Sequence, residues 1–267
     1  MIFKLDQDLH IHSFLSACCA DDYMTVETIT NFAVIHGYRE ICITDHVWST
    51  SVDGAPDWYR PQDIEHISLS KPLPEPPELK VFFGCEVEYL GGDKLSITRS
   101  EFDTFDFVVI PVNHMHMDGL VRPEGVDGVR NIAALVLRRL HELLTLDLPW
   151  ENIGIAHLSG DCMYYEGSIA DVLDAMDRSK LESVFFGLAR KGAGIELNAG
   201  AFKEWDCRRD VFFKFYDMAM RAGCKFYLAS DAHFAENLGG INKHLRKIID
   251  YLGLSEEQKY SIINRKC

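Results

Sequence analysis

The feature of this sequence that most constrains its fold is an alternation of short apolar runs with amphipathic stretches, which continues along the 267 residues. In its clearest unit, Thr25 suits the N-cap of a helix that can end at Gly37, and the apolar run 41–44 follows at once. Such a rhythm is typical of βα units that build a parallel sheet. The predicted strands are residues 8–11, 41–44, 81–87, 107–112, 153–156, 194–198 and 226–230.

Helices are predicted between these strands and beyond the last one. The one Pro-rich segment, residues 71–78, is predicted to be a stiff surface loop and not a linker, because the same rhythm continues on both sides of it. We therefore predict a single domain over residues 1–267. The predicted helices are residues 25–36, 61–68, 129–145, 170–176, 179–191, 208–221, 237–252 and 256–264.

Acidic residues outnumber basic ones, 41 to 27, so the formal net charge is −14. This surplus argues against unaided binding to nucleic acid or to an anionic membrane. No run reaches the ~18 apolar residues of a membrane-spanning helix, and the first twelve residues lack the features of a signal peptide. The eight cysteines are scattered without C-x-x-C spacing, which predicts reduced, buried thiols. We expect a cytoplasmic protein with no membrane partner and no stable nucleic-acid partner.

Side chains that can bind metals lie at or just beyond the C-terminal ends of the predicted strands. In a parallel barrel these ends converge on one face, where such folds place their chemistry. Each pattern alone has an ordinary explanation, since E-x-E is usually a surface pair and Thr-Asp-His can be a simple turn. Their gathering on one predicted rim instead predicts metal binding. The residues are His10, His12, Asp45, His46, Glu86, Glu88, His114, His116, His157, Asn198, Asp231 and His233.

The four remaining histidines fall in predicted helices or at a helix end. Beside Gly37, a cationic imidazole favours the helix dipole, and the other three have charged neighbours. Structural or surface roles are therefore predicted for His36, His66, His141 and His244.

The motifs along this rim resemble, in order, those of the PHP family, which are phosphoesterases related to histidinol phosphatase and to a domain of bacterial replicative polymerases. They are DLHIHS at 8–13, ITDH at 43–46, GCEVE at 84–88, DFVVI at 106–110 with His114, AH at 156–157 and SDAH at 230–233. The resemblance extends from residue 8 to residue 235. It implies a distorted (β/α)7 TIM-like barrel of parallel strands, with a trinuclear metal site at their C-terminal ends.

Carried over motif by motif, the resemblance implies two to three divalent ions. It assigns the first ion to His10, His12, Glu86 and Asp231, the second to His46 and His233, and the third to His114 and His157 with Glu86 as a bridge.

Two of these assignments have alternatives. The second ion needs another ligand before the first helix, where counting back from the T-D-H motif gives Asp21 and counting forward from His10 gives Cys18. We favour Asp21, because a carboxylate suits a hydrolytic metal better than a thiolate does. The spacing after the fourth strand is one residue longer than usual, so Asn113 and His116 are alternatives to His114.

Hydrolysis of a phosphate ester needs a nucleophile at neutral pH and positive charge against the phosphoryl oxygens, and clustered divalent ions supply both. We expect a metal-bound hydroxide as nucleophile and no covalent intermediate. Zn, Mn and Fe all suit histidine and carboxylate ligands. The G-x-S-x-G, P-loop and G-x-G-x-x-G signatures are absent from the sequence.

The resemblance implies a small anionic phosphomonoester as substrate, with histidinol phosphate the most familiar example in the family. Loops 48–60 and 115–129 should form the pocket walls, because they follow ligand-bearing strands. Arg122 is either a bidentate phosphate ligand or a solvated loop residue. Asn198 either orients a ligand or substrate or forms a turn.

Two other functions compete with a phosphoesterase. An amidohydrolase also opens with H-x-H on its first barrel strand, but the T-D-H and G-x-E-x-E motifs and the absence of an obvious metal-bridging lysine favour the PHP family. A PHP binding or regulatory module that has lost its chemistry is the other alternative, and the nearly complete set of ligands argues against it.

Overall fold

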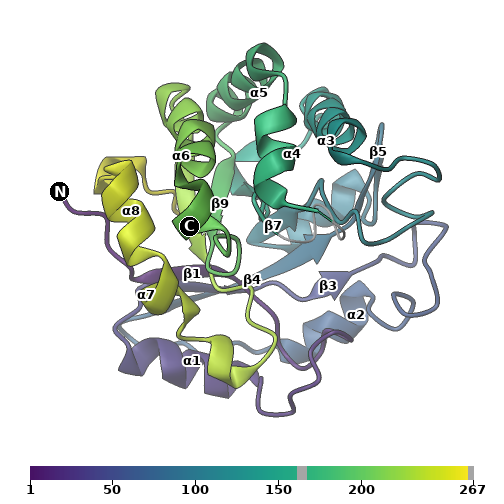
Figure 1. The fold of residues 1–267 in the computed structure, drawn as a ribbon. Helices are drawn as coiled ribbons and strands as arrows, with labels where there is room; N and C mark the ends of the chain where they lie inside the picture. The colour runs from purple at the N-terminus through teal and green to yellow at the C-terminus, as the bar shows by residue number, and fades with distance from the viewer. Residues whose placement is uncertain (161–166, 264–267) are drawn as a thin grey trace.

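In the computed structural model, which describes residues 1–160 and 167–263, parallel strands form a nearly closed barrel surrounded by helices (Figure 1). Each strand of the barrel wall pairs in parallel with the next one along the chain, as the predicted βα rhythm requires. The predicted distorted (β/α)7 barrel is confirmed. Its seven strands are β1 (Gln7–Ile11), β2 (Glu40–Ile43), β4 (Lys80–Val87), β7 (Phe107–Ile110), β8 (Ile153–Ile155), β9 (Gly194–Asn198) and β10 (Lys225–Ala229).

The barrel closes between β1 and β10, where the first and last strands meet. The backbone N–H of Asp231 donates to the carbonyl of His10 at 2.8 Å, and the N–H of His12 donates to the carbonyl of Ala232 at 3.2 Å. Side chains of β1 add to this closure, since the Asp8 carboxylate accepts from the N–H of Ser230 at 2.9 Å. The residues that follow β10 are thereby held beside the H-x-H motif.

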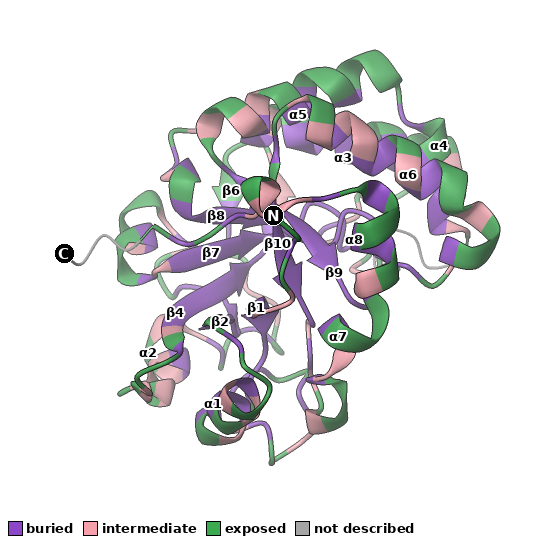
Figure 2. Ribbon diagram, turned by 90° about the vertical axis from the view of Figure 1, so that its left-hand side faces the viewer, coloured by how far each residue is buried: buried purple, intermediate pink, exposed green. Residues whose placement is uncertain are grey.

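The helices cover the outside of the barrel and bury one face each against it. Figure 2 shows the strands buried along their length, with the helices exposed mainly on their outer surface. As predicted, Thr25 caps the first helix, where its side chain accepts from the N–H of Thr28, and Gly37 follows with a positive φ of 72°. The helices are α1 (Val26–Ile35), α2 (Ile64–Ile67), α3 (Val129–Leu143), α4 (Ile169–Ala175), α5 (Arg178–Lys191), α6 (Trp205–Arg221), α7 (Gly240–His244) and α8 (Arg246–Leu252).

Three predicted helices differ from the observed structure. Residues 237–252 form two helices, α7 and α8, and residues 61–68 contain only the short α2, which a 3-10 turn (Ser68–Ser70) follows. Of residues 256–264, only Glu256–Gln258 is helical, and residue 264 lies outside the described range. The chain leaves the helical path there because the N–H of Tyr260 donates to the carbonyl of Phe226 in β10, at 2.8 Å.

Several short elements were not predicted. The strand β3 (His46–Val47) pairs with β4, and β5 (Tyr89–Gly91) forms a hairpin with β6 (Lys94–Leu95). The 3-10 turns Arg99–Thr104, Trp150–Asn152 and Ala235–Asn237 lie in the loops. Elements this short have too few residues to show a period in the sequence.

The cysteine prediction holds for four of the described thiols, because Cys19, Cys42, Cys85 and Cys224 are free and buried. Cys18 and Cys207 are instead free and exposed. The predictions for Cys162 and Cys267 lie outside the described residues. None of the helices in the described part of the chain has the length and apolar character needed to cross a bilayer.

Aromatic side chains fill the barrel at the end opposite the predicted rim. On β4, Phe82 belongs to a buried apolar cluster and shares a strand face with Glu86, since residues two apart point the same way. In the same cluster, the rings of Phe107 and Tyr227 meet edge to face with centroids 5.3 Å apart. Gly154 on β8 leaves the space that these two rings occupy, because a Cβ atom there would lie 2.5 Å from Phe107 and 2.6 Å from Tyr227.

Replacing Gly154 with alanine is therefore expected to lower the free energy of unfolding by about 1–3 kcal/mol, the usual cost of overpacking a core. Denaturant unfolding followed by circular dichroism would measure the change. The control is Gly239→Ala, because a Cβ atom at Gly239 meets its nearest neighbour, Phe32, at an ordinary 4.0 Å. Equal stability of the two variants would contradict this account of the barrel filling.

Candidate metal centre

Glu86 lies at the centre of the predicted rim, and its two carboxylate oxygens face different sets of imidazoles. The side chain comes from β4 and is buried. Its Oε2 lies 3.3 Å from the Nε2 atoms of both His10 and His12 and 3.2 Å from Nδ1 of His46. Its Oε1 lies 3.2 Å from Nε2 of His157 and 3.5 Å from Nε2 of His114. One carboxylate thus faces both halves of the site, as a bridging ligand must.

Ligand atoms of His10, His12 and Asp231 converge within 4.8 Å of one another, and we call these residues the first group. The two Nε2 atoms are 3.1 Å apart, and Oδ1 of Asp231 lies 3.3 Å from that of His12. Asp231 has a positive φ of 52°, an uncommon conformation for a non-glycine residue that is often found at functional sites. The first group therefore offers two nitrogens and one carboxylate to the same point.

Hydrogen bonds on the far side of each ring fix these two imidazoles. Nδ1 of His10 donates to Glu196 at 2.9 Å, and Nδ1 of His12 donates to the hydroxyl of Ser16 at 3.0 Å. Ser16 in turn donates to Asp45 at 2.7 Å and accepts from the N–H of His46 at 3.1 Å. With each Nδ1 engaged in this way, the Nε2 atom of each ring is the one that faces the site.

The third group consists of Glu86, His114 and His157, whose ligand atoms also lie within 4.8 Å of one another. Nδ1 of His114 donates to Glu88 at 2.7 Å, and Nδ1 of His157 donates to the side-chain oxygen of Asn113 at 3.2 Å. Here too the Nε2 atoms are left facing Glu86. His157 has a φ of 24°, so it shares the positive φ of Asp231.

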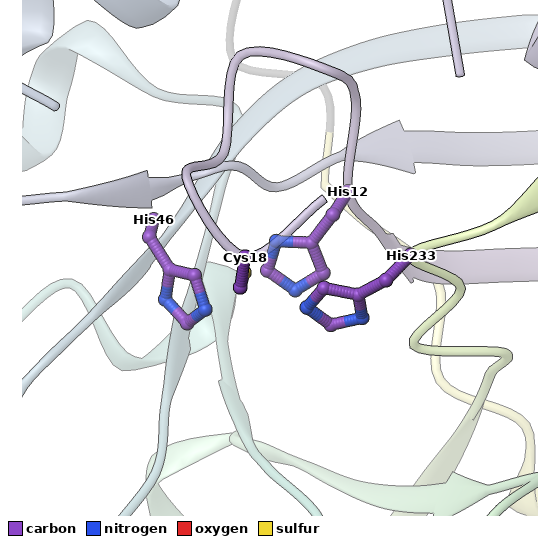
Figure 3. A group of neighbouring side chains, drawn as sticks. All are labelled: His12, Cys18, His46 and His233. Carbon is purple, nitrogen blue, oxygen red and sulfur yellow. The ribbon is translucent and has the colours of Figure 1, made fainter. Parts of the chain in front are cut away.

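The second group contains His12, Cys18, His46 and His233, again with ligand atoms within 4.8 Å (Figure 3). Figure 3 shows the four side chains converging from the loop after β1, from β3 and from the chain that follows β10. Nδ1 of His233 donates a hydrogen bond to the carbonyl of Asp231 at 2.9 Å, so Nε2 is the nitrogen of this ring that can bind a metal. This group brings together histidine nitrogens and one sulfur.

Burial and charge together set the protonation of the site. Burial acts to raise the pKa of Glu86, but the imidazoles of His46 and His10 outweigh it and hold the pKa well below the usual range. Burial acts to raise the pKa of Asp231 as well, and His10 and His12 again hold it low. Burial lowers the pKa of His46 and of His233. The carboxylates are therefore ionised and these two imidazoles neutral at pH 7, as metal ligands must be.

The donor atoms fit divalent cations. The Nε2 atoms of His10, His12, His114 and His157 face a single ionised carboxylate, and neutral imidazoles can donate these nitrogens to a cation that the carboxylate also binds. Histidine nitrogens and carboxylate oxygens in this combination suit zinc, iron or manganese.

The structure brings most of the predicted ligands together. Eight of the nine predicted metal ligands belong to the three groups. One of them, Glu86 of the third group, also faces histidines of the other two groups. Of the alternatives to His114, Asn113 orients His157 through the hydrogen bond described above, and His116 is an exposed residue beside the His114 ring, with centroids 5.3 Å apart. The eight are His10, His12, His46, Glu86, His114, His157, Asp231 and His233.

Asp21, the ligand favoured for the second ion, lies in none of the three groups found among the described residues. One of its carboxylate oxygens accepts from the N–H of Tyr23 and the other from the N–H of Ala235, both at 2.9 Å. Its side chain thus holds two loops together, and Cys18, the alternative to Asp21, lies in the second group.

The two predicted substrate residues have different surroundings. Arg122 forms ion pairs with Asp118 and Asp127 of its own loop, so its charge is already balanced there. The Nδ2 atom of Asn198 donates to Glu196 at 2.8 Å and to Asp231 at 3.2 Å, and its Oδ1 accepts from the N–H of Gly200 at 2.7 Å. The side chain thus makes the contacts of both alternatives, orientation of a ligand and a turn.

A family model described as "PHP domain" matches residues 8–200, more than half of the chain. The chain belongs to the PHP family. The resemblance seen in the motifs is thereby confirmed. No curated protein sequence matches this PHP domain.

Two solved structures resemble this PHP domain. Histidinol phosphate phosphatase from Lactococcus lactis subsp. lactis Il1403, complexed with zinc, L-histidinol and phosphate, has a TM-score of 0.55 at 17% identity, covering 96% of this chain and 98% of that one. The metal-dependent tyrosine phosphatases of Bacillus subtilis and Streptococcus pneumoniae are represented at a TM-score of 0.44 and 15% identity, covering 94% of this chain and 89% of that one. The first likeness shows a shared fold.

The sequence analysis missed residues that orient the candidate ligands of this PHP domain. Glu196 receives hydrogen bonds from His10 and from the hydroxyl of Tyr227, the latter at 2.7 Å. Tyr59 donates to Glu88 at 2.6 Å, next to His46. For Glu196 a signal existed, because a carboxylate in the middle of the apolar strand 194–198 needs a buried partner.

Replacing Glu196 with glutamine should weaken metal binding by about 10–100-fold, because the ring of His10 loses the carboxylate that orients it. Competition with a chromogenic chelator would give the dissociation constants. Glu182→Gln, on an exposed position of α5, serves as the control and should bind metal like the wild type. Unchanged affinity in Glu196→Gln would mean that the carboxylate does not support His10 as a ligand.

Proposed function

We propose that this protein is a metal-dependent phosphoesterase that hydrolyses a small phosphomonoester. The observation that carries the proposal is the position of Glu86 between two sets of imidazole nitrogens, each set turned toward it by hydrogen bonds from outside the site. Ions held by these residues would share one carboxylate and lie close together, as the metal-assisted displacement of a phosphoryl group requires.

His10, His12 and Asp231 would hold one ion, and His114 and His157 another, with Glu86 between them; His46 and His233 would contribute to a further one. Zinc, manganese or iron bound by these residues would lower the pKa of a water toward ~7 and balance the charge of the phosphoryl oxygens. Because those charges are local, an anionic substrate is compatible with a net charge of −14.

The chain's own side chains define the approach to these ligands. Trp58 is 40% exposed, and its ring meets that of His46 edge to face with centroids 6.0 Å apart. It also lies against Tyr59, at 4.1 Å between centroids. This contact supports the expectation that loop 48–60 forms one wall of the substrate pocket.

Histidinol phosphate is the first ester to test. The histidinol phosphate phosphatase of Lactococcus lactis, which shares this fold, was solved with L-histidinol and phosphate. A three-group donor set favours a catalytic site over a PHP module without chemistry. Turnover of amide substrates but not of phosphate esters would favour an amidohydrolase instead.

His12→Ala and Asp231→Ala should each reduce phosphatase activity by more than the ~100-fold typical of losing a residue that merely supports a ligand. Each variant should also lose bound metal while keeping its circular dichroism spectrum. His36→Ala is the control, because His36 stacks on Phe32 at the end of α1, outside the three groups. Full activity in either site variant would refute the assignment.

Protein purified without added metal or chelator should contain two to three equivalents of zinc, manganese or iron per chain by elemental analysis. A chelator should abolish hydrolysis of phosphomonoesters, and adding the metal back should restore it, because the ions supply both nucleophile and charge. If the chain binds no more than one equivalent after incubation with these metals, the clustered site is wrong.

A further inference from the structure

Cys18 contributes a sulfur to a site whose other donors are nitrogen and oxygen. Its Sγ lies within 4.8 Å of ligand nitrogens of His12, His46 and His233, and Figure 3 shows the four side chains facing a common space. Among the described residues, the second group is the only one of the three that contains a cysteine.

The nitrogen with which His12 can bind a metal already faces the first group. Its Nδ1 donates to Ser16, so a single lone pair remains, on Nε2. That atom lies 3.3 Å from both Glu86 and Asp231, within the first group. An ion in the second group therefore has His46 and His233 as its own histidines, and Cys18 supplies the third protein ligand that catalytic zinc sites typically have.

Contacts on both sides of Cys18 hold it in place. The N–H of Ala17 donates to the side chain of Gln62 at 2.8 Å, and the thiol of Cys19 donates to the carbonyl of His233 at 3.0 Å. Asp21 ties the same loop to Ala235. The loop is thus fastened both to the chain before α2 and to the chain after β10, which are the two sides from which the histidines of the second group come.

We propose that Sγ of Cys18 binds the ion held by His46 and His233, and that this thiolate makes the second group prefer Zn²⁺ to Mn²⁺. The thiol gives up its proton to solvent as the ion binds. Thiolates favour zinc, whereas carboxylates suit manganese, so a carboxylate at this position would lack the preference. The proposal rests on the metal dependence proposed above but not on the identity of the ester.

The first test is the spectrum of the whole chain, stripped of metal and titrated with Co²⁺. Wild-type protein should develop thiolate-to-cobalt charge-transfer absorption in the near ultraviolet, and Cys18→Ser should lose it. Cys207→Ser is the matched control, because Cys207 is also free and exposed but lies in α6, outside the three groups. A band that survives in Cys18→Ser would overturn the proposal.

The second test is equilibrium dialysis against Zn²⁺ and Mn²⁺. Cys18→Ser should lose more than about 10-fold in Zn²⁺ affinity for one equivalent, and Cys18→Asp should shift the preference of that equivalent toward Mn²⁺. Asp21→Asn should keep all equivalents. If Asp21→Asn loses an equivalent and Cys18→Ser does not, the ligand is Asp21.

Alkylation of the wild-type thiols tests the same ligand and does not depend on the folding of a variant. Zn²⁺ should protect Cys18, and not Cys207, from iodoacetamide, as read by peptide mass mapping; equal labelling of Cys18 with and without Zn²⁺ would refute the proposal. Phosphatase activity is a separate readout. A charge-transfer band without hydrolysis would refute only the proposed function. Hydrolysis without the band would refute only the proposal that Cys18 is a ligand.

Discussion

The carboxylate of Glu86 is the element on which the site depends. Burying an ionised carboxylate is costly unless opposite charge surrounds it, and here the imidazoles of neighbouring strands provide the environment. The register of the sheet puts it there, since Glu86 pairs with His46 on one side and Val109 on the other. The supporting residues then turn each ring so that its nitrogen faces this one side chain.

The barrel was predictable because strands buried on both faces appear in the sequence as nearly continuous apolar runs. Local periodicity failed where a distant partner decides the path of the chain. Residues after Gln258 have helical spacing, yet Tyr260 bonds to Phe226 and lies along β10. Likewise β3 and the β5–β6 hairpin depend on pairing with strands that a short segment does not reveal.

The side chains proposed as metal ligands were predictable from their positions at the strand ends, but the choice between Asp21 and Cys18 in the loop before the first helix was not. Spacing alone does not show the course of a loop, and Asp21 is engaged by a backbone N–H 214 residues away. The role of Glu196 was hidden for a similar reason. Its partners His10 and Tyr227 lie on β1 and β10, so only the assembled barrel brings them together.

The closure of the barrel between β1 and β10 has a consequence for its mechanical integrity. Other neighbouring strands are joined by ladders of paired residues, whereas this junction has the two backbone bonds from Asp231 and His12 and a few from side chains. Ligands from both sides of the junction belong to the first and second groups. An ion bound there would be a cross-link between the two ends of the chain and would close the longest loop of the fold. Metal binding would therefore stabilise the closure of the barrel between β1 and β10, at the site where the chemistry is proposed to occur.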